Sequence, residues 1–333
     1  MMGPEELKQK LKGVFCVQMT PFKQDGSLDL EGMRSNTRWL LEHAEGQDFV
    51  FVPEGSNGEF FVQSEDEFKA VVEMVCEEVA GRHPVIAGTA QAGTRETIKR
   101  SQFAQSVGAD GVLVVLPYYV PPEEEGVYRH YRAIAESIDI GVALYNNSLV
   151  SGCWLRPPVV ARLAEIPNFV AVKENTSSVL SFRMMQKAVE PNAVVLCGRG
   201  EEIYPFVARF GCPGFVSFLS NFMPGRSLEM YRAAREENYE EVDALHERLI
   251  PFFKDPEIVG ALPPGASFTA RLNAAHGPSA GLRGGASMQF ASMKAAMDLV
   301  GLHGGCVRLP MLEIAAEERE ELRGILAEQG LLD

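Results

Sequence analysis

The chain has 333 residues, 46% hydrophobic and 23% charged, a balance typical of soluble globular proteins and not of disordered or collagen-like chains. Its 45 acidic and 31 basic residues give a formal net charge of -14, so the chain offers no excess of cations to neutralise nucleic-acid phosphates. We therefore expect neither DNA nor RNA as a partner.

The amino terminus, MMGPEELKQKLKG, is charged throughout and lacks the apolar stretch of a signal peptide. No later segment approaches about 18 consecutive apolar residues, the length that favours a membrane-spanning helix. The cysteines lack a C-x-x-C pair and the histidines lack an H-E-x-x-H motif. We expect a cytoplasmic protein with reduced thiols, no membrane contact, no bound metal and no cofactor.

Eight short apolar runs rich in β-branched residues recur along the chain. They begin roughly 29 residues apart on average, the length of one strand with its covering helix. The runs are apolar on both faces, as in parallel strands buried under helices. This pattern predicts an α/β fold, a (β/α)8 TIM barrel, and not an open doubly wound sheet. The eight runs are residues 14–17, 49–52, 85–87, 112–116, 142–145, 170–173, 194–197 and 214–218.

Helical patterns lie between and after these runs. The clearest is 64–80, where Ser64 and Glu67 predict a capping box, one apolar stripe follows, and Gly81 supplies a stop. Residues 222–253 also read as helical.

Beyond the eighth run no further strand is predicted. The segment 255–287 is rich in Gly, Pro and Ala and suits a surface crossing, and helical patterns resume at 288–299 and 317–328. We expect a barrel over residues 1–225 and a C-terminal helical appendage over 226–333, packed on the barrel.

In such a barrel the reacting residues follow the carboxyl ends of the strands. Lys173 ends the run FVAVK, where desolvation would disfavour its charged form and leave a nucleophilic amine for Schiff-base chemistry. A lysine paired with Glu174 at the strand end is the structural alternative. Tyr145 ends the preceding run and is either a proton donor beside Lys173 or a core tyrosine.

A turn of small residues, Gly55-Ser56-Asn57-Gly58, follows the second run. Its backbone N–H groups suit an anion such as a carboxylate, although a plain tight turn has the same sequence pattern.

Read in order, several motifs give the chain a family resemblance. They are TPF (20–22), GSNGE (55–59), PVIAGT (84–89), GADGVLVVLPYY (108–119), YN (145–146) and VAVKE (170–174), with a weaker match at VRLP (307–310). The chain resembles the dihydrodipicolinate synthase and N-acetylneuraminate lyase superfamily over roughly residues 13–221. That resemblance implies a class I aldolase on a TIM barrel, a homo-oligomer, tetrameric or dimeric, that uses pyruvate or another 2-keto acid.

The resemblance also implies roles for single residues. Lys173 corresponds to the Schiff-base lysine, Tyr145 to the proton-shuttling tyrosine and Ser56 to the hydroxyl of the proton relay. Tyr119 corresponds to a tyrosine that reaches across a dimer into the neighbouring site.

The remaining correspondences concern substrate binding. The amides of Ser56 and Asn57, in the turn that includes Gly58, correspond to the cradle of the pyruvate carboxylate. Val216 corresponds to a residue whose backbone carbonyl faces the site.

One departure separates this chain from the synthases. Where they have an arginine that holds the aldehyde's carboxylate, this chain has Val150, and an isopropyl group cannot replace a guanidinium. Arg199 or Arg183 is a candidate replacement from another loop. Hydroxyls of a sugar acid would instead use Asn147, Asn175 or Glu201.

We therefore expect a Schiff-base lyase that acts on pyruvate or 2-keto-3-deoxy acids, with keto acids and aldehydes as its small-molecule partners. One alternative is a 4-hydroxy-tetrahydrodipicolinate synthase proper, which condenses pyruvate with aspartate semialdehyde. Another is a catalytically inactive homologue that only binds a keto acid. The joint presence of Lys173, Tyr145 and Ser56 argues against the inactive homologue.

Overall fold

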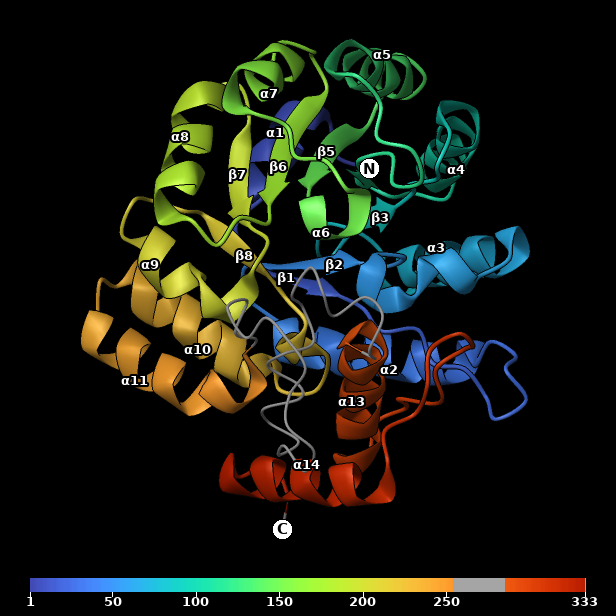
Figure 1. Ribbon diagram of the computed structural model, residues 1–333, viewed down its shortest axis with the longest axis vertical. Coiled ribbons are helices and arrows are strands. Elements are labelled where there is room, and N and C mark those ends of the chain that lie inside the picture. Colours follow the sequence, from blue (N-terminus) through green and yellow to red (C-terminus); the bar gives the residue numbers. More distant parts are fainter. Residues whose placement is uncertain (254–284, 333) are drawn as a thin grey trace.

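Eight parallel strands form the centre of the molecule, and helices surround them (Figure 1). The computed structural model describes residues 1–253 and 285–332. The strand order is β2-β1-β8-β7-β6-β5-β4-β3, and a parallel bridge between Phe51 and Val85 joins the two ends of the sheet. The predicted (β/α)8 barrel is confirmed. The strands are β1 (Gly13–Val17), β2 (Phe49–Val52), β3 (Ile86–Gly88), β4 (Gly111–Val115), β5 (Gly141–Asn146), β6 (Phe169–Glu174), β7 (Val194–Cys197) and β8 (Gly214–Ser217).

The helices connect successive strands and continue after the last one. The α-helices are α1 (Pro4–Lys10), α2 (Leu30–Ala44), α3 (Glu65–Val79), α4 (Thr94–Ser106), α5 (Glu124–Ala135), α6 (Ser148–Ser151), α7 (Pro157–Leu163), α8 (Val179–Val189), α9 (Tyr204–Ala208), α10 (Pro224–Arg235), α11 (Tyr239–Leu249), α13 (Gly285–Leu299) and α14 (Ala316–Glu328). Short 3-10 turns are η1 (Ser56–Gly58), η2 (Phe60–Val62), η3 (Gly200–Glu202), η4 (Leu219–Asn221) and η5 (Ile250–Phe252). Within the described ranges, every helix falls short of the length or apolarity that crossing a bilayer requires.

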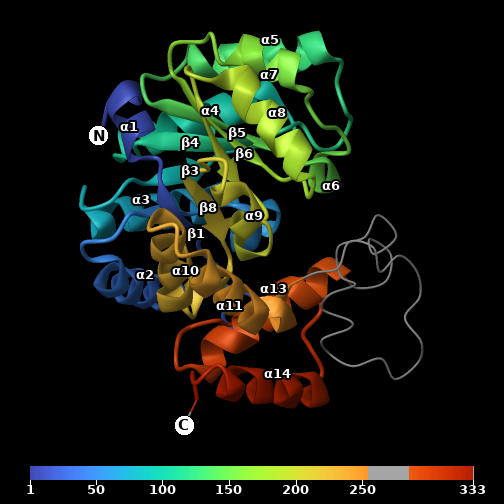
Figure 2. The same cartoon turned by 90° about the vertical axis from the view of Figure 1, so that its left-hand side faces the viewer.

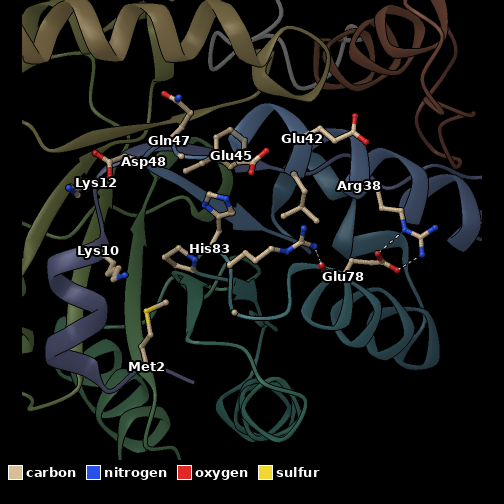
Figure 3. A pocket seen from close by; sticks show the side chains of 16 residues that line it. Met2, Lys10, Lys12, Arg38, Glu42, Glu45, Gln47, Asp48, Glu78 and His83 are labelled. Carbon is tan, nitrogen blue, oxygen red and sulfur yellow. Dashed lines mark hydrogen bonds and ion pairs between the residues drawn. The ribbon is translucent and has the colours of Figure 1, made fainter.

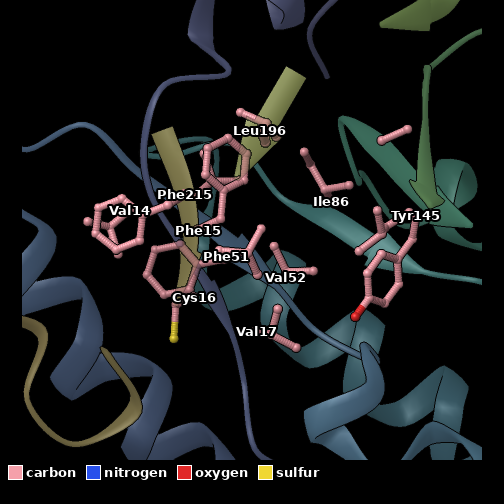
Figure 4. Packing of buried hydrophobic residues seen from close by; sticks show 14 of the residues in the cluster. Val14, Phe15, Cys16, Val17, Phe51, Val52, Ile86, Tyr145, Leu196 and Phe215 are labelled. Carbon is pink, nitrogen blue, oxygen red and sulfur yellow. The ribbon is translucent and has the colours of Figure 1, made fainter. Parts of the chain in front are cut away.

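The barrel core consists of side chains from several strands that pack together. Phe15 of β1, Phe51 of β2, Leu196 of β7 and Phe215 of β8 belong to this cluster (Figure 4). Both faces of the strands are buried, which explains their unbroken apolar runs.

The helix α3 confirms the local prediction closely. The Ser64 hydroxyl accepts a hydrogen bond from the Glu67 backbone, and the Glu67 carboxylate accepts one from the Ser64 backbone. These bonds satisfy amides at the helix start that have no partner within the helix. The helix ends where Ala80 adopts φ 48°, followed by Gly81 at φ 75°.

The predicted helical segment 222–253 is divided. The helix α10 ends before Glu237, which adopts φ 57°, and α11 begins at Tyr239. The helix α10 packs against β1 and α2. The predicted boundary at residue 225, between the barrel and the C-terminal helical appendage, falls at the start of α10. This boundary stays a prediction.

The helices α13 and α14 lie outside the ring of strands, with α14 farther from it (Figures 1 and 2). They confirm the predicted helical patterns near the carboxyl terminus. Most of the Gly-, Pro- and Ala-rich segment 255–287 lies outside the described residues.

Candidate active site

A pocket of about 150 Å³ lies at the carboxyl ends of the barrel strands, where a TIM barrel carries its reacting groups. Its wall combines loops after five strands with the first described side chains of α13. The polar residues that line it are Ser56, Asn57, Tyr145, Asn147, Lys173, Asn175, Arg199, Glu202 and Gln289. The apolar ones are Leu149, Val150, Val216, Phe218 and Phe290.

Lys173 lies in this pocket with its amine desolvated. The residue is 5% exposed, and burial lowers the pKa of the amine from 10.5 to about 7. Its Nζ lies 3.8 Å from the centre of the Tyr145 ring, and Tyr145 is the register partner of Lys173 in the β5–β6 pair. No carboxylate in residues 1–253 or 285–332 lies within ion-pair distance of Nζ. A substantial fraction of the amine is therefore neutral near pH 7.

The alternative pairing of Lys173 with Glu174 is wrong. Successive residues of a strand point to opposite faces, so the Glu174 carboxylate faces away from the amine. It accepts hydrogen bonds from Asn146 Nδ2 at 2.8 Å, Trp154 Nε1 at 3.0 Å and the Thr176 amide at 3.0 Å. Burial raises the pKa of Glu174 to about 7, while these bonds act in the opposite direction.

The Tyr145 phenol is held by a partner that sequence reasoning assigned elsewhere. The Asn147 side-chain amide donates a hydrogen bond of 2.7 Å to the Tyr145 hydroxyl. Burial raises the pKa of Tyr145 to about 12, whereas the Asn147 bond and the charge of Arg199 act to lower it. The phenol is thus protonated at neutral pH and oriented beside Lys173. The sequence predicts Asn147 as a partner of substrate hydroxyls, and the structure adds a bond from it to Tyr145.

The turn after β2 presents unused backbone donors to the pocket. Ser56 and Asn57 begin η1, and within the described chain neither backbone N–H has an acceptor. The Gly58 amide instead closes the turn by donating to the Gly55 carbonyl at 3.0 Å. Gly58 does not line the pocket, and a Cβ there would lie 3.1 Å from the Gln18 carbonyl and the Thr20 hydroxyl. The geometry suits a carboxylate at Ser56 and Asn57, with Gly58 shaping the turn.

The other predicted site residues divide between the pocket and its surroundings. Asn175 and Val216 line the pocket. Glu201 does not, because η3 directs its carboxylate to the hydroxyls of Ser217 at 2.6 Å and Ser227 at 2.5 Å. Tyr119 lies outside the pocket and is 86% exposed.

The two arginines considered as replacements differ in position. Arg199 lines the pocket, whereas Arg183 hydrogen bonds to the Phe210 carbonyl and Gln186 outside it. Val150 lines the pocket and is 45% exposed.

Sequence reasoning did not identify Gln289 and Phe290 as site residues. They come from α13, more than a hundred residues after Lys173, and no local motif marks them. The hydrophobic pattern of 288–299 predicts the helix, but it does not predict that the first described residues of this helix line the pocket.

A larger hollow of about 750 Å³ lies at the other end of the barrel (Figure 3). Its wall includes Lys10, Asp48 and His83, which come shortly before β1, β2 and β3. Because the amino ends of the strands do not carry the chemistry of TIM barrels, we place the active site at Lys173. Among the described residues, no three His, Cys, Asp or Glu side chains are placed to hold a metal ion.

Comparison with known proteins gives one consistent result. Residues 10–261 match the model of the dihydrodipicolinate synthetase family. The 4-hydroxy-tetrahydrodipicolinate synthase of Methanothrix thermoacetophila is 36% identical over 95% of this chain and 96% of its own length. The 4-hydroxy-tetrahydrodipicolinate synthase of Methanopyrus kandleri is 33% identical over 97% of this chain and 98% of its own length. The crystal structure of dihydrodipicolinate synthase from Thermotoga maritima matches with a TM-score of 0.81 and 29% identity, covering 96% of this chain and 99% of that one.

Proposed function

The chain belongs to the dihydrodipicolinate synthetase family of lysine Schiff-base lyases, and from this membership we propose that Lys173 forms the Schiff base. The substrate is pyruvate or a 2-keto-3-deoxy acid. The observation that carries the proposal is the buried Lys173 amine, which lies without a counter-ion in the described chain against the Tyr145 ring.

The proposed chemistry uses the neutral amine as the nucleophile. Lys173 Nζ adds to the C2 carbonyl, and the resulting carbinolamine loses its oxygen as water after protonation. Tyr145 is the proton donor for this step, because its phenol is protonated and held by Asn147. The iminium then accepts the electron pair of a bond at C3, either C–H or C–C, and the Tyr145 phenolate left by the loss of water takes the proton from C3 or from the C4 hydroxyl. Ser56 and Asn57 amides hold the keto-acid carboxylate.

A 4-hydroxy-tetrahydrodipicolinate synthase proper is the second candidate, favoured by the names of the relatives. Val150 argues against it, because its side chain at the pocket offers no bond to the carboxylate of aspartate semialdehyde. A coupled assay with the next reductase decides between them. Efficient condensation with aspartate semialdehyde by the unmodified protein would favour the synthase.

An inactive keto-acid-binding homologue is the third candidate. The presence of Lys173, Tyr145 and Ser56 in one pocket supports an enzyme instead. Turnover of any keto acid and aldehyde pair excludes the inactive homologue.

The proposal extends to assembly and compartment. Tyr119 and Val120 are both exposed and adjacent, which suits a homo-oligomer contact between two apolar surfaces. Six unpaired cysteines suit the reducing cytoplasm. Tyr119→Asp should lower the mass measured by light scattering, and a monomeric unmodified protein would refute the oligomer.

Borohydride trapping tests the assignment of Lys173. Pyruvate with borohydride should add one carboxyethyl group to the intact protein, located on Lys173 by peptide mapping. Lys173→Met should abolish the label, whereas Lys187→Met, which changes an exposed lysine paired with Glu190 on α8, should retain it. Labelling of another lysine, or none with any keto acid, contradicts the proposal.

A further inference from the structure

Arg199 lines the active-site pocket and carries a buried hydrogen-bond donor that has no acceptor in the described chain. Its side chain is 7% exposed and forms an ion pair with Glu202, which also lines the pocket. The Nε of Arg199 is buried, and within the described chain it has no hydrogen-bond partner. A buried N–H without a partner is costly, and native proteins rarely leave one unfilled. The pocket wall therefore includes a guanidinium, held by Glu202, whose Nε lacks an acceptor among the described residues.

The backbone brings Arg199 against the pocket wall. A Cβ at Gly198 would lie 2.8 Å from the Glu174 carbonyl oxygen and 3.0 Å from the side chain of Asn175. The next glycine, Gly200, adopts φ 60°. The loop passes close to β6 at Gly198 and to the Val216 carbonyl of β8 at Gly200, and these close approaches require glycine. The charge of Arg199 acts on the Tyr145 hydroxyl from this loop.

The pair with Glu202 fixes the guanidinium and limits what it can bind. The Glu202 carboxylate already binds one terminal nitrogen of the Arg199 guanidinium. Its negative charge would repel a doubly charged ligand, such as a phosphate, more than a singly charged one. A carboxylate carries a single charge and accepts a bond from Nε, so it suits this site better than a phosphate. Pyruvate does not need this donor, because the free amides of Ser56 and Asn57 suit its carboxylate.

We propose that Arg199 binds a carboxylate on the aldehyde half of the substrate. This inference rests on the proposed function and narrows it. The substrate class becomes 2-keto-3-deoxy acids with a second carboxylate, whose cleavage at C3–C4 releases pyruvate and a carboxylate-bearing aldehyde. Arg199 would supply, from the loop after β7, the guanidinium that Val150 lacks, and Val150 would then no longer argue against the synthase.

Two aldehydes that differ in a carboxylate, and a third that carries a phosphate, test the inference. We would measure condensation of pyruvate with 4-oxobutanoate, with butanal, and with glyceraldehyde 3-phosphate. The unmodified protein should prefer 4-oxobutanoate to butanal by about tenfold or more in kcat/KM, because the carboxylate adds a charge-assisted hydrogen bond. Equal rates for these two aldehydes, or a preference for the phosphate, would overturn the inference without any variant.

Variants then assign the preference to Arg199. Arg199→Met and Arg199→Lys both remove the N–H donor at the Nε position, and the lysine variant keeps the charge beside Glu202. Both should raise KM for 4-oxobutanoate about tenfold or more relative to KM for butanal, and any change in kcat through Tyr145 is common to the two aldehydes and cancels in this comparison. Arg183→Gln, outside the pocket, should change neither.

Borohydride trapping separates this inference from the proposed function. Loss of pyruvate trapping in both Arg199 variants would assign Arg199 to the pyruvate carboxylate and overturn the inference. An equal loss for both aldehydes would assign it a structural role and also overturn it. Absence of trapping in the unmodified protein would refute the proposed function itself.

Discussion

The desolvation of Lys173 predicts that its replacement makes the protein more stable while abolishing turnover. In Lys173→Met the side chain keeps a similar length and loses the charge that is costly to bury. The pKa of this amine falls from 10.5 to about 7 on folding, and each pKa unit corresponds to about 1.4 kcal/mol. Burial of the amine therefore costs the folded state about 4 kcal/mol at pH 7.

The sign of the pH dependence follows from proton binding. Between pH 7 and 10.5 the unfolded chain keeps the Lys173 proton and the folded chain releases it, so the unmodified protein becomes more stable as the pH rises. At pH 9 the remaining cost is about 2 kcal/mol by the same relation. Lys173→Met lacks this dependence, so its stability advantage should shrink by about half from pH 7 to pH 9.

Denaturant unfolding at both pH values measures the effect. The free energy of unfolding of Lys173→Met should exceed that of the unmodified protein, with the larger difference at pH 7. Lys187→Met controls for general effects of lost charge, since its amine is exposed on α8. A difference that stays constant with pH, or a Met variant less stable at pH 7, would refute the claim that Lys173 is desolvated.

Two further predictions concern the Tyr145 phenol and the buried ion pair of Lys294 with Glu59. Tyr145→Phe keeps the ring under Lys173 but removes the proton donor, so kcat should fall about a hundredfold or more with the fold intact; normal turnover would make the phenol structural. Lys294→Met leaves the buried Glu59 carboxylate without the Nζ that lies 2.5 Å away, which should cost about 3–5 kcal/mol in unfolding free energy. Adding Glu59→Gln should recover part of that loss, and no loss in the single variant would show that the pair is not stabilising.

Sequence reasoning was most successful where the physics is local. The apolar run FVAVK predicts a desolvated lysine at its end, and the Lys173 side chain is buried there. The capping box of α3 was equally local, since Ser64 and Glu67 bond within one turn. Both predictions depend only on residues close together in the chain.

Side-chain direction in the loops was not predictable in this way. Sequence reasoning gave Glu201 to the substrate, but η3 turns it toward Ser217 and Ser227. It gave Asn147 to the substrate as well, although this side chain caps α6 and holds the Tyr145 hydroxyl. These outcomes depend on backbone geometry in 3-10 and short helical turns, which a residue pattern does not specify.

The pocket also depends on the C-terminal region, and this dependence bears on the chemistry. Gln289 and Phe290 of α13 line the same pocket as Lys173, and the Lys294–Glu59 pair ties α13 to the residue that follows η1. Burial is the cause of the lowered Lys173 pKa, so we expect α13 to contribute part of that effect.

A displaced α13 would let water reach Lys173 and move its pKa back toward 10.5. In folded Lys294→Met protein, the rate of pyruvate imine formation should therefore reach half its maximum at a higher pH than in the unmodified protein. The rate of borohydride trapping between pH 6 and pH 10 would measure the midpoint. If the midpoint is unchanged while the unfolding free energy falls, α13 stabilises the fold but does not lower the Lys173 pKa. The desolvation of Lys173 would then come from the barrel alone.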